Sequence, residues 1–143
     1  MSDDMPASPV SVHPPSPQQR YLRLRPNERR ALEDYLIQLR ARFGEHIRHV
    51  ILYGSRARLS GDQESDLDVL IVIDREDWLL ANEVADQAFG PSLQHGVLIS
   101  PQVWSEDHFQ AHRRFGLLIY RNIERDGIEL WSDETKSPLF SIG

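Results

Sequence analysis

Residues 49–73 read HVILYGSRARLSGDQESDLDVLIVI, and this stretch decides the fold. The apolar, β-branched runs at 49–53 and 69–73 predict two buried strands. Between the runs, a Gly-Ser turn at 54–55 leaves the first strand, and Asp-Leu-Asp at 66–68 opens the second. The stretch therefore places a tight turn and a pair of carboxylates close together, which predicts chemistry as well as structure.

The Gly-Ser turn has the features of a phosphate-binding turn. Gly54 lacks a Cβ, so the backbone can turn sharply and approach a ligand closely. Ser55 adds a hydroxyl donor, and we expect residues 55–59 to begin a short helix whose free N–H groups attract an anion. Most Gly-Ser pairs in proteins are only turns, so this interpretation depends on the residues that follow.

The two carboxylates of Asp66 and Asp68 strengthen the interpretation of the Gly-Ser turn as a phosphate-binding turn. Asp66 and Asp68 are separated by one residue of the predicted strand 66–73, so their side chains point to the same face. Two ionised carboxylates this close repel each other unless a cation lies between them. Mg²⁺ prefers oxygen ligands and is commonly shared between carboxylates and substrate phosphates. The pair therefore predicts a magnesium site beside the turn.

The rest of the chain alternates helices and strands. Apolar residues at three- and four-residue steps predict a helix at 27–43, with Asn27 as its N-cap and Gly44 as its end. The later predicted elements are a helix at 76–89 stopped or kinked by Gly90-Pro91, a strand at 97–104 with Pro101 at an edge or bulge, a helix at 105–125 interrupted near Gly116, and a strand at 128–131.

This order predicts an α/β (α+β) domain, with a small mixed β-sheet and flanking helices in two or three layers. The first two strands are joined either by a crossover or by an antiparallel return. Five of the nine prolines lie in residues 1–18, which predicts a disordered tail at 1–19. We assign the domain to 20–143, with its core at about 27–132.

Composition excludes several classes of protein. The chain has 143 residues and no cysteine, which fits one domain without disulfides or a cysteine zinc site. A net charge of −6 argues against long nucleic acid as the main ligand. We see neither an apolar run of membrane-spanning length nor a signal-peptide pattern, so we expect no membrane and a cytoplasmic location.

The segment 52–58 (LYGSRAR), together with Ser-Asp-Leu-Asp at 65–68, resembles the signature of the minimal nucleotidyltransferases of the DNA polymerase β superfamily. The resemblance covers residues 30–132. It implies a polymerase-β-like nucleotidyltransferase core that uses Mg²⁺ and a nucleoside triphosphate, with ATP expected. It also implies site residues: Gly54, Ser55, Arg56 and Arg58 for the nucleotide, Asp66 and Asp68 for the metal, and Ser55, Asp66 and Asp68 for catalysis.

The resemblance also implies a partner. Many members of this size resemble the antitoxin halves of two-gene pairs whose partner is a small helical HEPN-type protein, and some are similar to enzymes that transfer AMP onto a partner tyrosine. We therefore expect a nucleotidyltransferase that acts on a hydroxyl of a partner protein. The alternative is a non-catalytic antitoxin or binding module that acts by contact with a HEPN-type partner.

One part of the family pattern is missing. Active members place a third carboxylate on the neighbouring strand, but residues 97–104 (VLISPQVW) contain no Asp or Glu. Asp74 is six residues beyond Asp68 and therefore about 20 Å away along the strand. Glu106 resembles a first-turn helix acid, and His95 is more often a surface histidine than a general base. Leu59 stands where the family frequently has glycine.

Overall fold

The structure is a computed structural model that describes residues 13–61 and 65–132. Four strands form one mixed sheet in the order β3-β2-β1-β4. Strand β1 (Ile47–Tyr53) pairs antiparallel with β2 (Leu67–Ile73) and with β4 (Ile128–Ser132), whereas β2 pairs parallel with β3 (Ile99–Ser105). The connection between the first two strands is therefore an antiparallel return.

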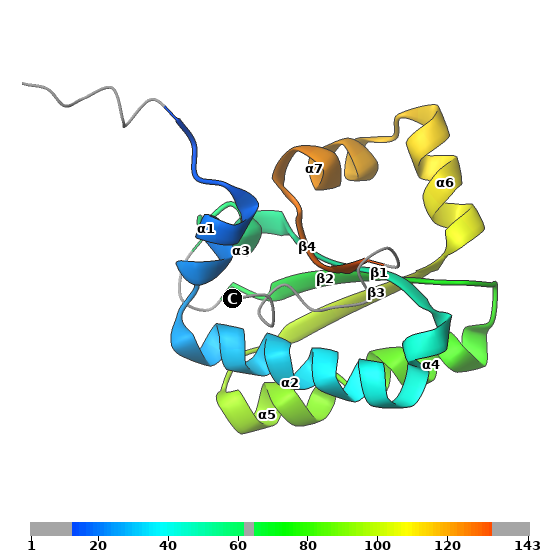
Figure 1. The fold of residues 1–143 in the computed structure, drawn as a ribbon, viewed down its shortest axis with the longest axis horizontal. Helices are drawn as coiled ribbons and strands as arrows, with labels where there is room; N and C mark the ends of the chain where they lie inside the picture. Colours follow the sequence, from blue (N-terminus) through cyan, green and yellow to red (C-terminus); the bar gives the residue numbers. More distant parts are fainter. Residues whose placement is uncertain (1–12, 62–64, 133–143) are drawn as a thin grey trace, which may run out of the picture.

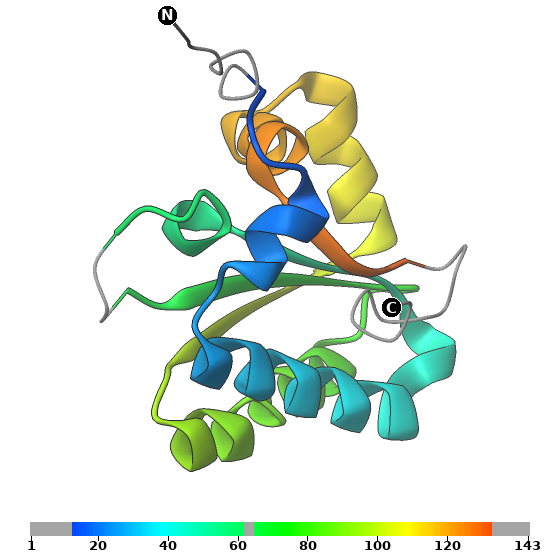
Figure 2. The ribbon, with the colours of Figure 1, turned by 60° about the vertical axis from the view of Figure 1, so that its left-hand side comes forward.

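Helices cover both faces of this sheet and make three layers (Figure 1). One face carries α2 (Pro26–Phe43), α4 (Trp78–Asp86) and α5 (Phe89–His95). The other carries α6 (Glu106–Phe115) and α7 (Leu118–Asp126), as Figure 2 shows from a second direction. The remaining elements are short: α1 (Pro17–Leu22), α3 (Gly54–Ala57) and the 3₁₀ turn η3 (Gly44–His46). The predicted mixed sheet with flanking helices is confirmed.

The alternation of β2 determines which face receives the paired carboxylates. Leu67 and Val69 belong to the larger core, which includes residues of α2 and α4. Leu70 and Val72 belong to the smaller core, which includes residues of α6 and α7. Since successive side chains of a strand point to opposite faces, Asp68 shares the α6–α7 face with Leu70. The face of the sheet that carries α6 and α7 therefore also carries the candidate site.

Helix α2 begins one residue earlier than predicted, and the prediction that Asn27 caps it was wrong. The N-cap is Arg25, and Pro26 occupies the first helical position, where its fixed φ suits a helix start. Asn27 instead donates its side-chain amide to the carbonyl oxygen of His95 at 3.2 Å. It therefore joins α2 to the end of α5.

The predicted helix at 76–89 is α4, and a second helix, α5, follows it from Phe89 to His95. The Asp77 carboxylate caps α4 by accepting from the N–H of Leu80 at 3.0 Å. Of the two predicted effects of Gly90-Pro91, a stop or a kink, the stop was wrong, because the break in the helix comes before them, at residues 87–88, and both residues lie in the first turn of α5. Proline is tolerated there, since the first N–H groups of a helix have no intrahelical acceptor.

Other boundaries follow the sequence more closely. The edge position of β3 agrees with Pro101, and Gly116 separates α6 from α7 with a φ of +59°. Helix α1 begins at Pro17, inside the segment predicted as a tail, with Ser16 as its cap. Residues 1–12 of that predicted tail lie outside the described residues. Within the described part of the chain, no helix has the length and apolarity to cross a membrane.

Candidate functional site

The antiparallel pairing of β1 and β2 brings the two halves of the motif together. Tyr53, the last residue of β1, lies opposite Asp68. The next residue, Gly54, has a φ of +79°, and a Cβ built on it would lie closer than 3.0 Å to Oδ2 and 3.2 Å from Cγ of Asp68. The Asp68 carboxylate therefore occupies the space that a side chain at position 54 would need.

The electrostatics of the carboxylate pair suit a bound cation. Asp66 is exposed just before β2, whereas Asp68 is half-buried within it. Burial, and then the neighbouring charge of Asp66, raise the pKa of Asp68 above its ordinary value. Burial and the charge of Asp68 likewise raise the pKa of Tyr53. A divalent cation between the two carboxylates would relieve this repulsion, so the residues present fit Mg²⁺.

Ser55 lies close to residues that follow α3, namely Ser60, Gly61 and Ser65. A Cβ on Gly61, which has a φ of +79°, would lie 2.5 Å from Oγ of Ser65 and 3.0 Å from Oγ of Ser55. Ser60 donates both its N–H and its hydroxyl to the carbonyl oxygen of Ser55, at 2.8 and 3.1 Å. The chain therefore folds back so that the hydroxyls of Ser55 and Ser65 both lie close to Gly61, on the approach to Asp66.

The first arginine of the motif has a structural role. Arg56 donates from Nε to Oε2 of Glu28 at 2.9 Å and from Nη2 to Oε1 at 3.1 Å. Its Nη1 donates to the carbonyl oxygen of Ser60 at 2.9 Å. The Glu28 side chain is fully buried and Arg56 is only 11% exposed. These contacts connect α3 to α2, and the nucleotide contact that the sequence predicts for Arg56 stays a prediction.

The second arginine is open to a ligand. The Arg58 side chain is 44% exposed, and its Nη1 lies 3.8 Å from Oδ2 of Asp126. It lines a cavity of about 330 Å³ together with Tyr53, Gly54 and residues of α7. Of the two motif arginines, Arg58 therefore has the surroundings expected of a phosphate ligand.

Strand β3 brings no third carboxylate to the pair. Its parallel register places Ser100 opposite Asp68, and Gln102 follows on the same face. Nε2 of His95 lies 2.6 Å from Oδ2 of Asp34, so the imidazole already has a partner on α2. Within residues 13–61 and 65–132, no group of three or more His, Cys, Asp and Glu side chains could hold a metal ion. A metal on Asp66 and Asp68 would complete its coordination with substrate oxygens and water.

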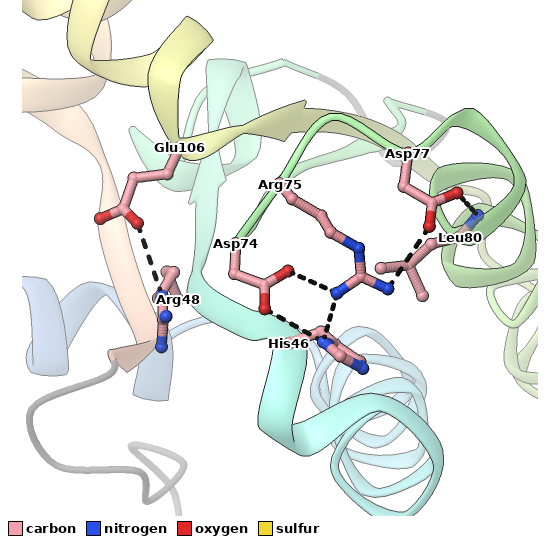
Figure 3. A network of polar contacts seen from close by, with 7 residues as sticks. All are labelled: His46, Arg48, Asp74, Arg75, Asp77, Leu80 and Glu106. Atoms are coloured by element: carbon pink, nitrogen blue, oxygen red, sulfur yellow. Dashed lines mark hydrogen bonds and ion pairs between the residues drawn. The ribbon is translucent and has the colours of Figure 1, made fainter.

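The other acids considered from the sequence lie at the far end of the sheet (Figure 3). Oδ2 of Asp74 lies 3.0 Å from Nδ1 of His46, and its Oδ1 lies 3.4 Å from Nη1 of Arg75. Glu106 is in the first turn of α6 and lies 3.5 Å from Nε of Arg48. The prediction that neither acid completes the site is consistent with these contacts.

The structure adds residues that sequence reasoning missed. Tyr53 was predicted only as a strand residue, although its position before Gly54 and opposite Asp68 places it in the site. Leu118, Ile119 and Asn122 of α7 line the same cavity as Gly54. No local pattern could reveal this contact, because it depends on how α7 returns over the sheet.

Leu59 supplies a test of the backbone after the motif. Its φ is +61°, the left-handed region that suits glycine, although its side chain packs against the larger core. Alanine would keep the strain and lose the packing, whereas glycine would lose both. We therefore expect Leu59→Gly to be more stable than Leu59→Ala by about 1 kcal/mol, measured by urea unfolding.

An ordinary helical or extended backbone gives the opposite order, because alanine then restricts the unfolded chain more than glycine does. Finding Leu59→Ala at least as stable as Leu59→Gly would contradict the left-handed conformation.

Comparisons with known proteins show the family of the chain. The family model for the nucleotidyltransferase domain matches residues 32–126, and the chain belongs to that family. It is 31% identical over 105 residues to the "Putative protein adenylyltransferase MJ0604" of Methanocaldococcus jannaschii, which covers 73% of this chain and 99% of the relative. The expected membership of a nucleotidyltransferase family is confirmed.

Two solved structures are also similar. One is described as "a putative nucleotidyltransferase from Sulfolobus solfataricus", with 16% identity, a TM-score of 0.47, and coverage of 89% of this chain and 96% of that one. The other is a mutant of the toxin–antitoxin pair MntA–HpeT, with 16% identity, a TM-score of 0.47, and coverage of 77% and 81%.

Proposed function

We propose that this protein binds a magnesium–nucleoside triphosphate, with ATP as the nucleotide, and transfers a nucleotidyl group to a hydroxyl of a partner protein. The observation that carries the proposal is the close approach of Gly54 and Asp68. This approach joins the turn, which would bind phosphate, and the carboxylates, which would bind metal, in a single site. Family membership supports it, as does a relative whose printed name is a protein adenylyltransferase.

Each site residue has a role in this reaction. Asp66 and Asp68 would hold Mg²⁺, which when bound supplies positive charge to the phosphates. The Ser55 hydroxyl and the Arg58 guanidinium would bind phosphate oxygens. The acceptor oxygen forms a bond to the α-phosphorus while the bond from that phosphorus to the bridging oxygen breaks. Pyrophosphate leaves, and the acceptor proton passes to solvent or to a base of the partner.

The acceptor is best supplied by a tyrosine. Ser100 and Gln102 are the neutral side chains that β3 offers near Asp68, so the described site holds no third carboxylate to take the acceptor proton. A tyrosine hydroxyl, with an ordinary pKa of about 10, loses its proton far more readily than an aliphatic hydroxyl. A partner tyrosine therefore depends least on a base from this chain.

Label transfer tests the proposal. With ATP labelled at the α-phosphate, Mg²⁺ and a HEPN-type partner, we expect label on the partner protein. Asp68→Asn keeps the shape of the side chain but removes a metal-binding charge, so we expect transfer to fall by roughly 100-fold or more. Asp74→Asn is the matched control, since Asp74 lies at the other end of β2 beside His46.

Equal transfer by the parent protein and Asp68→Asn would contradict the role of the carboxylate pair. Failure of the parent protein to label any partner, under conditions where it binds Mg–ATP, would remove the claim of transfer.

A second candidate function is antitoxin action by contact with a HEPN-type partner. It is favoured by the neutral side chains of β3 and by exposed apolar residues on α4 and α5: Trp78, Leu79, Phe89 and Leu93. The same variants distinguish the two functions. Partner neutralisation that survives Asp68→Asn unchanged supports contact, and neutralisation that falls together with label transfer supports catalysis.

A further inference from the structure

We infer that the nucleobase of the bound nucleotide lies in the cavity between the end of β1 and helix α7, where Asn122 contacts its polar edge. This inference rests on the proposed function, because it concerns the same nucleotide. The cavity has a volume of about 330 Å³ and is lined by Tyr53, Gly54, Arg58, Leu118, Ile119 and Asn122. That volume is at the lower end of the range of about 300–1,000 Å³ that holds small ligands.

The cavity is in the right place for a base. It shares Gly54 with the phosphate and metal site, and it is also lined by Tyr53, which lies opposite Asp68. Two other cavities, around Phe43 and Trp131 and around His49 and Phe109, have no lining residue in common with that site. A ligand whose phosphates contact Gly54 can therefore place its ring in the α7 cavity without crossing the sheet.

The lining is suited to a flat, largely apolar ring. Leu118, Ile119 and the Tyr53 ring provide apolar surface, and the Leu118 side chain is 70% exposed. A nucleobase laid against these side chains would remove that apolar surface from water and could stack on the tyrosine. Without a ligand, the Leu118 side chain stays exposed to water.

Asn122 adds polar recognition to this lining. A side-chain amide has both donors and an acceptor, which match the amino group and ring nitrogen at one edge of adenine. Nη2 of Arg125 donates to Oδ1 of Asn122 at 3.3 Å, one turn along α7, and this bond restrains the amide. Arg58, at the same cavity, carries the positive charge that the adjoining phosphates need.

The test compares two ligands that share phosphates and differ in the base. Isothermal titration calorimetry measures the affinities of the full chain for Mg–ATP and for Mg–tripolyphosphate. For Leu118→Ser and for Asn122→Ala, we expect ATP affinity to fall about tenfold, while tripolyphosphate affinity stays at the parent value. Leu117→Ser is the matched control, because Leu117 is the exposed neighbour and does not line the cavity.

Three results would overturn the inference. If the parent binds ATP and both variants keep its affinity, the base lies elsewhere, although the proposed function stands. If the variants lose label transfer to the partner but keep ATP affinity, the cavity holds the acceptor side chain. If the parent binds neither ATP nor tripolyphosphate, the proposed function fails, and this inference fails with it.

Discussion

Glu28→Ala is expected to lower the free energy of unfolding by about 3–5 kcal/mol, which urea denaturation would measure. Glu28 is fully buried and binds the Arg56 guanidinium through both carboxylate oxygens. It also accepts from the N–H of Arg25 at 2.8 Å, at the start of α2. Removing the carboxylate leaves a nearly buried guanidinium without its counter-ion and a helix start without its acceptor.

The pH dependence of this effect follows from the pKa of Glu28. Burial raises that pKa, but the hydrogen bonds from Arg56 and Arg25 lower it by more than burial raises it. The pKa of Glu28 therefore lies below its ordinary value. A carboxyl with a lowered folded-state pKa stabilises the protein above its unfolded-state pKa, and the contribution is lost as pH falls through the folded-state value. The difference in the free energy of unfolding between the parent and Glu28→Ala should therefore be largest at neutral pH and become smaller in acid.

Glu83→Ala is the control for this experiment, because Glu83 is exposed on α4 and its loss should change stability by less than about 0.5 kcal/mol. If Glu28→Ala unfolds at the same urea concentration as Glu83→Ala, the buried pair contributes nothing to stability.

Gly54→Ala is expected to abolish detectable binding of Mg–ATP and to destabilise the protein by about 2 kcal/mol or more. The added Cβ would collide with the Asp68 carboxylate, so either the turn or Asp68 must move. The φ of +79° adds strain that an L side chain rarely accepts. Titration calorimetry measures the binding, and thermal or urea unfolding measures the stability.

Gly44→Ala provides a matched control at the other end of β1. Gly44 has a φ of −53°, and the nearest atoms to its added Cβ would be 4.0 Å away. We expect this variant to bind Mg–ATP like the parent and to be equally or slightly more stable. Parent-like binding by Gly54→Ala would show that Asp68 does not need the space beside the turn.

Much of the fold could be predicted because its signals are local. The apolar runs on either side of the motif became β1 and β2, and Pro101 correctly indicated an edge strand. The errors occurred where two local signals competed. Gly90-Pro91 normally ends a helix, but here the pair lies in the first turn of α5, where a proline breaks no intrahelical bond.

The candidate site divides in the same way. Gly54 and Asp68 meet because β1 and β2 pair antiparallel, which is one of the two connections that the sequence left open and which places the end of one strand beside the start of the next. The role of Arg56 could not be predicted, because its partner Glu28 lies 28 residues earlier, on a helix whose orientation only the tertiary structure provides. The same is true of α7, whose residues line the site from the far end of the chain.

The register of β3 shows which position of this chain lies nearest to the carboxylate pair on the neighbouring strand. Ser100 lies opposite Asp68, on an edge strand, with a side chain that is only half-buried. Replacing Ser100 with aspartate or glutamate would add an acid beside the carboxylate pair without repacking either core. One substitution on an edge strand would then complete a carboxylate trio, and the sheet itself need not be rebuilt.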